Sequence, residues 1–403
     1  MRGRCVVLVA RVLLAVACTP LLSCFFDRSG IRASSSKDAG LSDVFGGEVT
    51  VTADGLPPDG SSHDQPAVEP QVLKLTFKNK SRKEALVGFV VLVTLTPSQF
   101  DYQVADPTGA DLRFVDDDGK TALPHEIERW TPKGTSFVWV RVPKIDAGSD
   151  SDFITLRYGD PAVGKAQDPN AVWADHLAVY HLADDPGQAP PQIRDSSSSG
   201  FHGTAKGALS KSSRIDGRIG GALALNASQG DFIEIGDKEP LNVDVGEART
   251  LQAWFRTATT STKAYFLQNE LDCRGWGLTI HDDGVVLGRL ALGAGCPDYT
   301  SHHLGSWGTS FADTMWHHVA FVIDRSKGTA SLFVDGQLVD SEAIDIALPG
   351  AGGVAKIGSN WNDSTTFDGA IDEVRISDGA RSAEWIDAEH ASMTDVLLDY
   401  PTR

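Results

Sequence analysis

Residues 332–339 have the sequence LFVDGQLV, and residues 316–322 before them have the sequence WHHVAFV. The Asp-Gly pair in the first segment accepts the positive φ angles that a type I′ turn needs, so residues 332–339 are predicted to form a β-hairpin. Further out, residues 251–255 (LQAWF) and 367–376 (FDGAIDEVRI) have the aromatic and β-branched content of strands. The chain also contains 40 glycines, which favour turns over long helices. The fold class is therefore predicted to be all-β.

These segments follow one another in an order that resembles the laminin-G-like modules of the concanavalin A-like superfamily. The resemblance rests on the motifs WHHVAFV, LFVDG and FDGAIDEVRI, with RSAEWI at residues 381–386. It implies a jelly-roll β-sandwich of two packed antiparallel sheets over residues 170–393. It also implies that Trp385 starts a short helix that covers an edge. The positions expected on the inner faces are Ala320, Val322, Leu332 and Val334.

An earlier stretch, residues 71–163, is predicted to be a β-rich domain with a sandwich-like fold. Its strand candidates include residues 137–142 (FVWVRV) and 153–158 (FITLRY), which are rich in β-branched and aromatic residues. Residues 110–114 (ADLRF) and 123–128 (LPHEIE), followed by VWVRVP, resemble the bacterial domain-of-unknown-function family 2341. That resemblance implies no known activity.

The N-terminus resembles the signal peptide of a bacterial lipoprotein. An apolar run follows two early arginines, and residues 21–24 (LLSC) resemble a lipobox. The resemblance implies that residues 1–23 are removed and that Cys24 carries the lipid. Residues 24–70 contain polar stretches rich in Gly, Pro and Ser and are predicted to be a flexible tether. The protein is thus expected in the cell envelope, attached to the outer membrane only by its lipid and facing the periplasm or the cell surface. The alternative is an ordinary secretory signal with an incidental cysteine.

Two cysteines, Cys273 and Cys296, lie far from the N-terminal segment that contains the other three. An even pair in an exported chain is predicted to form a disulfide. Concanavalin A-like modules also often hold a structural calcium ion through aspartates and loop carbonyls, which suit a hard cation. The candidate ligands are Asp195, before a run of serines, and Asp372 in IDEV. The alternative for Asp372 is that it caps backbone groups at a strand start. No other cofactor is expected.

The predicted function is non-catalytic binding of a glycan or of an envelope or surface protein. Glucanases of the same superfamily place carboxylates at alternate positions of one strand, in the pattern Glu-x-Asp-x-Glu, and the chain has no such pattern. The net charge of −18 argues against nucleic acid as a partner, because nucleic acid requires a basic surface. Two alternatives remain open. One is a structural component of an envelope assembly, since domains like the first occur with TolQ/ExbB-type proton channels. The other is a divergent glycoside hydrolase.

Overall fold

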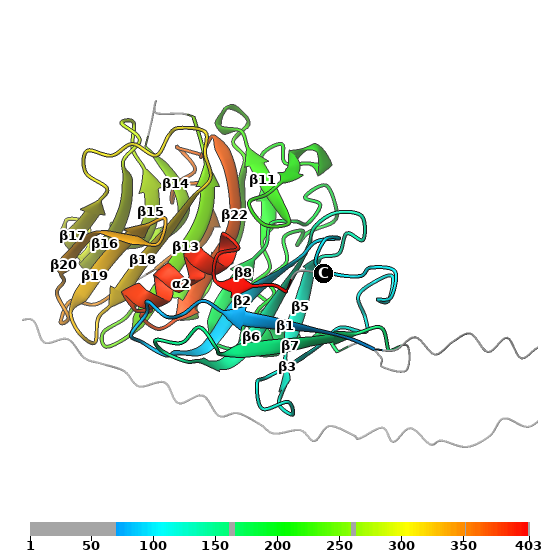
Figure 1. Cartoon of the computed structure of the whole chain (residues 1–403). Helices are drawn as coiled ribbons and strands as arrows, with labels where there is room; N and C mark the ends of the chain where they lie inside the picture. The colour runs from blue at the N-terminus through cyan, green and yellow to red at the C-terminus, as the bar shows by residue number, and fades with distance from the viewer. Residues whose placement is uncertain (1–69, 161–165, 259–262, 351, 402–403) are drawn as a thin grey trace, which may run out of the picture. The chain divides into compact units, whose positions relative to one another are not determined.

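The computed structural model describes residues 70–160, 166–258, 263–350 and 352–401, which belong to one compact unit, residues 65–403. Strands dominate this unit, and the predicted all-β class is confirmed (Figure 1). Cys24 and the predicted signal peptide and tether lie outside the described residues, apart from residue 70. No described helix is long and apolar enough to cross a lipid bilayer.

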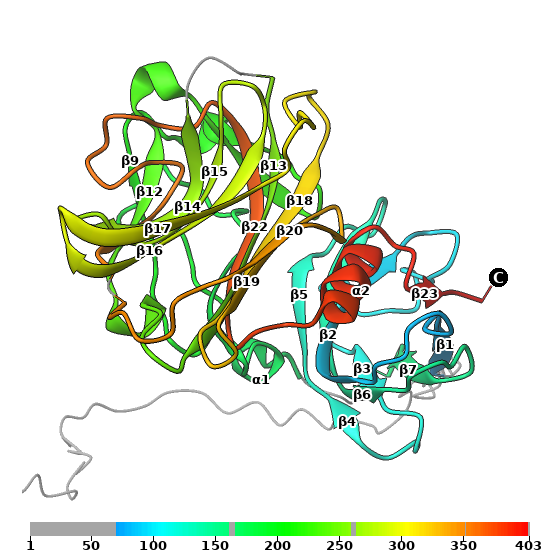
Figure 2. The same ribbon diagram turned by 90° about the vertical axis from the view of Figure 1, so that its left-hand side faces the viewer.

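Most of the chain after residue 170 forms a sandwich of two antiparallel sheets, as Figures 1 and 2 show. The eight-stranded sheet contains, in spatial order, β10 (Arg214–Asp216), β11 (Gly221–Leu225), β22 (Gly369–Asp378), β13 (Ala248–Arg256), β18 (His317–Asp324), β19 (Thr329–Val334) and β20 (Gln337–Ala343), while β8 (His176–Tyr180) also pairs with β22. The seven-stranded sheet contains β17 (Asp298–Gly305), β16 (Val286–Gly295), β15 (Arg274–Ile280), β14 (Ala264–Leu271), β21 (Val354–Ile357), β12 (Phe232–Asp237) and β9 (Thr204–Lys206). The predicted jelly-roll sandwich is therefore present.

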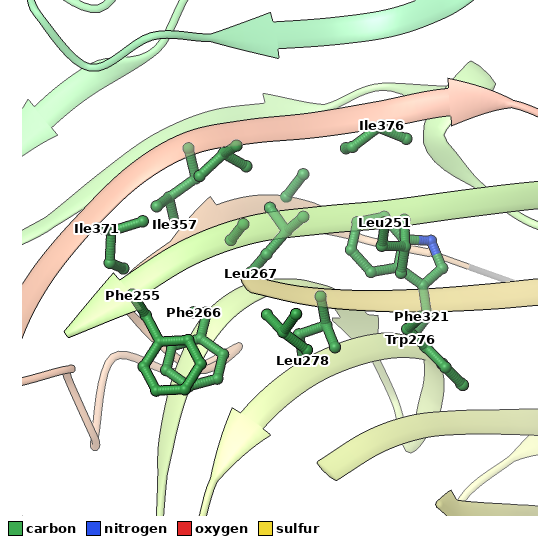
Figure 3. Close-up of a cluster of buried hydrophobic side chains, with 14 of the residues drawn as sticks. Leu251, Phe255, Phe266, Leu267, Trp276, Leu278, Phe321, Ile357, Ile371 and Ile376 are labelled. Atoms are coloured by element: carbon green, nitrogen blue, oxygen red, sulfur yellow. The ribbon is translucent and has the colours of Figure 1, made fainter. Parts of the chain in front are cut away.

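Large apolar side chains from both sheets meet between them (Figure 3). Phe255 of the eight-stranded sheet stacks on Phe266 of the seven-stranded sheet, with ring centroids 4.2 Å apart. Trp276 and Leu278 of β15 join the same buried cluster. Because each strand alternates its side chains between two faces, these residues leave their neighbours on the outer faces of the sandwich.

Two of the four positions predicted to line the inner faces lie there. Leu332 and Val334 lie in the core between the two sheets, as expected. Ala320 and Val322 instead face outward and pack in a second cluster with side chains of the first domain. The prediction placed these two side chains of β18 on the wrong face. The strand is buried on both sides, so its apolar pattern does not distinguish the two faces.

The first domain also consists of two sheets. The five-stranded sheet contains β23 (Leu398–Asp399), β1 (Gln71–Phe77), β7 (Phe153–Tyr158), β3 (Arg113–Val115) and β4 (Ala122–Leu123). The three-stranded sheet contains β2 (Leu86–Leu95), β6 (Ser136–Ile145) and β5 (His125–Arg129). Both sheets contribute to one apolar cluster, which includes Leu75, Phe89 and Val140. The short helices of the described chain are α1 (Pro169–Val172) and the 3₁₀ turns Lys211–Ser213, Ala227–Gln229 and Glu239–Leu241.

The C-terminal segment returns from the sandwich to the first domain. Helix α2 (Ala383–Met393) begins after Ser382, whose side chain accepts a hydrogen bond from the Trp385 N–H. The predicted short helix is thus confirmed, and it covers an edge, that of strand β2 (Figure 2). Strand β23 then pairs with β1. The boundaries 71–163 and 170–393 stay predictions; the helix within the second range packs on the domain of the first.

Candidate functional site

The outer face of the seven-stranded sheet bears a row of polar residues in register. Gln268 of β14 lies opposite Gly277 of β15, which lies opposite Arg289 of β16. Arg289 in turn lies opposite His303 of β17. The neighbouring residues in these strands, such as Leu278, point into the core. The sequence therefore folds into a sheet with an apolar inner face and a polar outer face that is interrupted at Gly277.

A hollow of about 480 Å³ lies over this interruption. Its lining includes Lys263, Tyr265, Glu270, Asp272, Arg289 and Trp361. At its base, β15 has Gly277 where the neighbouring strands carry Gln268 and Arg289. A Cβ atom on Gly277 would lie 3.2 Å from Glu270 Oε1 and 3.2 Å from the Tyr265 ring. Glycine thus leaves room for these two side chains to pack over β15 at the base of the hollow.

Charged groups at the base of the hollow are linked to one another. Arg289 donates a short hydrogen bond to Glu270 Oε1. Burial, together with the charge of Glu270, raises the pKa of Tyr265 to about 12, so its hydroxyl remains protonated at neutral pH. Lys263 lies with its Nζ 5.1 Å from the centre of the Tyr265 ring. Burial lowers the pKa of Lys263, and the negative charge of Glu270 opposes that shift.

The exposed aromatic group of the hollow is Trp361. Its side chain is 54% exposed, on the loop between β21 and β22. Lys356 holds that loop in place. Its Nζ donates to the Trp361 carbonyl oxygen over 3.1 Å and also forms an ion pair with Asp363. A tryptophan fixed by its backbone and open to solvent on its ring is suited to stacking on a ligand.

The predicted disulfide between Cys273 and Cys296 is confirmed, with Cα atoms 5.5 Å apart. The two cysteines flank a hairpin of β15 and β16, which pair in register from Ile280 and Val286 outward. Both half-cystines line the hollow. The disulfide therefore ties the turn between β14 and β15 to the turn between β16 and β17 at one rim of the hollow.

The two predicted calcium ligands lie in separate hydrogen-bonded positions. Asp195 is buried and accepts hydrogen bonds from Val179 N at 2.9 Å, Phe201 N at 2.8 Å, and both N and Oγ of Ser197 at 2.9 Å. These contacts fix the serine-rich loop. Asp372 is buried on β22 and accepts from Ile219 N at 3.0 Å. Calcium at these residues stays a prediction, which melting curves with calcium and with a chelator can test.

Three other residues have ligand atoms close enough to share a cation. One ligand atom from each of Glu128, His181 and Glu373 lies within 4.8 Å of the others, which makes them the one such group in the described part of the chain. Residues 125–129 form β5, so Glu126 and Glu128 project from alternate positions of one strand. The sequence contained that alternation, but His181 and Glu373 come from distant segments that only the fold brings together.

Another pair was missed by the search for glucanase carboxylates. Glu270 and Asp272 are two residues apart and both line the hollow. Only part of the Glu-x-Asp-x-Glu pattern is present, because Arg274 stands where the second glutamate would be. Asp272 lies in the turn after β14, with φ of 50°. The signal for this pair was a two-residue spacing at the end of a strand, which is common by chance.

Comparison with known proteins agrees with the architecture. Residues 227–387 match the family described as the concanavalin A-like lectin/glucanases superfamily. The domain that contains the hollow is therefore a concanavalin A-like β-sandwich. Residues 108–189 match the domain of unknown function DUF2341. The chain thus combines a DUF2341 domain with a laminin-G-like, concanavalin A-like domain, as the two resemblances implied. No curated protein sequence matches it.

Among solved structures, binding domains of two toxins align with part of the chain. The binding domain of Paraclostridial Mosquitocidal Protein 1 aligns with a TM-score of 0.42 and 15% identity, over 54% of this chain and 52% of that one. The Botulinum Neurotoxin serotype G binding domain aligns with a TM-score of 0.40 and 17% identity, over 53% and 50%. The chain spans about half the length of each of these structures.

Proposed function

We propose that this protein is a non-catalytic lipoprotein of the cell envelope that binds a carbohydrate in the hollow on its concanavalin A-like domain. The observation that supports it most is Trp361, a ring 54% exposed at the rim of a pocket that also contains four charged side chains. Sugar rings have apolar faces that stack on aromatic side chains and hydroxyls that hydrogen-bond to charged and amide groups. The hollow offers both kinds of contact, an aromatic ring and a few converging polar groups.

The groups that would bind the hydroxyls are already positioned. Arg289 and Glu270 form an ion pair in which the side chains are only 12% and 6% exposed, so neither is free to swing into solvent. Lys263 stands above Tyr265, and among the described residues no carboxylate lies within ion-pair distance of it. A ligand would therefore meet pre-organised donors and acceptors, which lowers the entropic cost of binding.

A protein ligand at the same domain, and a structural role in an envelope assembly with a TolQ/ExbB-type channel, remain the competing proposals for the binding role. Glycoside hydrolysis is a third, supported by the presence of Glu270 and Asp272 in one hollow. We favour binding because Glu270 is already engaged by Arg289 and Tyr265, which makes it a poor nucleophile or proton donor. The lipid anchor on Cys24 is part of the proposal as well.

A glycan array tests the binding role directly. The chain from residue 24 onward, with Cys24→Ser to prevent lipid attachment, is applied to immobilised glycans at neutral pH. Selective retention on one glycan class supports the proposal, and calorimetry then gives the affinity. If none of the immobilised glycans retains the protein, the proposal of carbohydrate binding fails. Release of reducing sugar from a bound glycan, lost in Glu270→Gln, would replace binding by hydrolysis.

A further inference from the structure

His181 connects the two domains through both of its ring nitrogens. It follows β8 of the sandwich directly, and its Nδ1 lies 2.6 Å from Glu373 Oε1 on β22. Its Nε2 lies 3.3 Å from Glu126 Oε2 on β5 of the first domain. The side chain is only 11% exposed, and those of Glu126 and Glu373 are 9% and 0% exposed. One imidazole ring therefore stands between a carboxylate of each domain, away from water.

The carboxylates are held in place by other donors, so they cannot turn away from the ring. Glu126 accepts from Trp173 Nε1 at 2.6 Å and from Ser196 Oγ at 2.9 Å. Glu373 Oε2 accepts from Arg375 Nε at 3.1 Å. The backbone of Glu373 has a φ of 49°, in the left-handed region that a residue with a Cβ rarely adopts. This conformation coincides with a register shift in β22.

The register shift has a consequence for where Glu373 points. Its chain neighbour Val374 lies in the core of the sandwich, and Asp372 pairs in register with Trp254 on the face toward the first domain. A bulge at Glu373 places a second consecutive carboxylate on that same face. Strained backbone of this kind is maintained only when the surrounding contacts determine it, and here those contacts are His181 and Arg375.

The geometry fits two protons on the ring and does not fit a shared metal ion. A carboxylate oxygen only accepts, so each nitrogen that faces a carboxylate must supply an N–H. In a tetrahedral zinc site with bonds of about 2.1 Å, an imidazole nitrogen and a carboxylate oxygen lie roughly 3.4 Å apart. The 2.6 Å between His181 Nδ1 and Glu373 Oε1 is a hydrogen-bond distance.

We propose that His181 is a buried imidazolium that fastens the DUF2341 domain to the concanavalin A-like domain, so that the two act as one body until alkaline pH removes its proton. The ring packs against Trp139 and Trp173, with ring centroids 6.2 and 5.7 Å away, and little space for water lies beside it. The proposal is independent of the carbohydrate site on the other sheet.

Charged groups surround the ring on several elements, and Asp184 and Arg194 line the small pocket beside it. Strand β5 supplies Glu126 and Glu128, and β22 supplies Asp372, Glu373 and Arg375. Arg218, from the turn between β10 and β11, lies near Asp372. Two carboxylate oxygens of this cluster, Glu128 Oε1 and Asp372 Oδ1, are buried without a hydrogen-bond partner. Orphaned oxygens of this kind are typical of carboxyl groups that hold their own proton.

The pKa values of His181 and Glu128 are both shifted upward. Burial lowers the pKa of His181, but the charges of Glu373 and Glu126 outweigh it and hold that pKa well above its usual value. Burial, with the charge of Glu373, raises the pKa of Glu128 to about 8. Both groups bind protons more tightly in the folded chain than in the unfolded one. Their contribution is therefore complete at low pH and falls as pH rises: through the range above 6.5 for His181, and from about 4.5 to 8 for Glu128.

Calorimetric unfolding of the chain from residue 24, with Cys24→Ser, tests the proposal at pH 6 to 10. We expect one transition for both domains at pH 6 to 7, and a separation into two transitions on the alkaline side. His181→Gln should show the separated transitions already at pH 7. His181→Arg keeps a permanent charge and should retain one transition up to pH 10. His281→Gln, on the hairpin turn of the other sheet, is the matched control and should behave as the parent chain.

Two outcomes overturn the proposal. The first is a parent chain that keeps a single, unshifted transition to pH 10. The second is one equivalent of a divalent metal in the purified protein, lost in His181→Gln but not in His281→Gln, whose chelation separates the transitions. If His181→Gln does not fold, the pH series of the parent chain and the His181→Arg variant still decide between these results.

Discussion

The backbone N–H of Leu92 donates a hydrogen bond to the hydroxyl of Ser392 over 2.8 Å, although 300 residues separate the two. Leu92 lies in β2, an edge strand of the three-stranded sheet, and Ser392 lies in the last turn of α2. Beyond the helix, Thr94 N donates in the same way to the Tyr400 hydroxyl at 2.8 Å. The C-terminal segment therefore satisfies and covers an edge that would otherwise be open to pairing with another chain.

Removal of the main apolar contact of that helix should destabilise the first domain. Trp385 is 6% exposed and packs edge-on against Phe89, with ring centroids 5.1 Å apart. Trp385→Ala is expected to lower the free energy of unfolding by about 3–5 kcal/mol, as for other buried aromatic residues. Val396→Ala, at a side chain 59% exposed, is the control and should change it by less than about 0.5 kcal/mol. Denaturant unfolding measures both, and equal effects would show that the helix does not support the fold.

How far the sequence predicts this protein depends on the range of the interactions involved. The hairpin at residues 332–339 forms as expected, because a turn with positive φ at Asp335 and Gly336 is set by local sterics. The outward direction of Ala320 and Val322 was not predictable, because it depends on a domain packing from outside. The family resemblances gave the sandwich, but neither resemblance contains both His181 and Glu373, which only the fold brings together.

The candidate sites show the same limit. The disulfide was predicted from the even pair of cysteines in a chain expected to be exported, and it is present. The base of the hollow depends on Gly277, whose missing side chain matters only because Glu270 and Tyr265 pack over it. The cluster at His181 unites carboxylates from β5 and β22 that are far apart in the chain. Properties that arise from register across a sheet or between domains are not visible in the periodicity of a single segment.

Loss of the disulfide should destabilise the sandwich. The bond closes a loop with a sequence separation of 23 residues, which corresponds to about 3 kcal/mol in the chain-entropy model. Mass spectrometry of an unreduced digest should show the Cys273 and Cys296 peptides linked. The Cys273→Ser/Cys296→Ser variant should unfold at lower denaturant than the parent chain, and reduction should affect the parent but not the variant. Two separate peptides in the unreduced digest would contradict the prediction.

Acid should destabilise the fold through a histidine that is buried in its neutral form. Burial, followed by the nearby charge of His390, lowers the pKa of His318 to about 3. The unfolded chain takes up the proton near pH 6.5 and the folded chain does not, so the free energy of unfolding falls as pH drops below 6.5. This group alone should cost about 2 kcal/mol at pH 5.

The variant His318→Gln keeps a donor for Gln252, which faces His318 Nε2 at 3.0 Å, and it cannot titrate. Between pH 7 and pH 5, the free energy of unfolding of the variant should fall less steeply than that of the parent chain. The difference between the two slopes should correspond to about one bound proton. Denaturant unfolding at half-unit pH steps gives both slopes. Identical slopes would show that His318 does not govern the acid response.

The lipid anchor remains a prediction from residues 21–24. In bacterial cells grown with an alkyne-bearing fatty acid, the full chain should be labelled and should fractionate with membranes. Cys24→Ala should lose the label and leave the membrane fraction, because the acyl chains on Cys24 are the proposed anchor. Cys18→Ala is the matched control, because Cys18 follows a less suitable cleavage site. Labelling that persists in Cys24→Ala would refute the anchor.

Carbohydrate binding in the hollow at Trp361 can be tested by comparing two tryptophan substitutions, one in the hollow and one outside it. Trp361→Ala removes the exposed ring at the rim of the hollow, and Trp307→Ala removes another exposed ring, 62% accessible, outside its lining. Isothermal titration with the glycan selected on the array should show a loss of affinity of about tenfold or more for Trp361→Ala, equivalent to about 1.4 kcal/mol, and no change for Trp307→Ala. Both variants should melt with the parent chain. Equal affinity of Trp361→Ala and the parent chain would show that the glycan does not bind at Trp361.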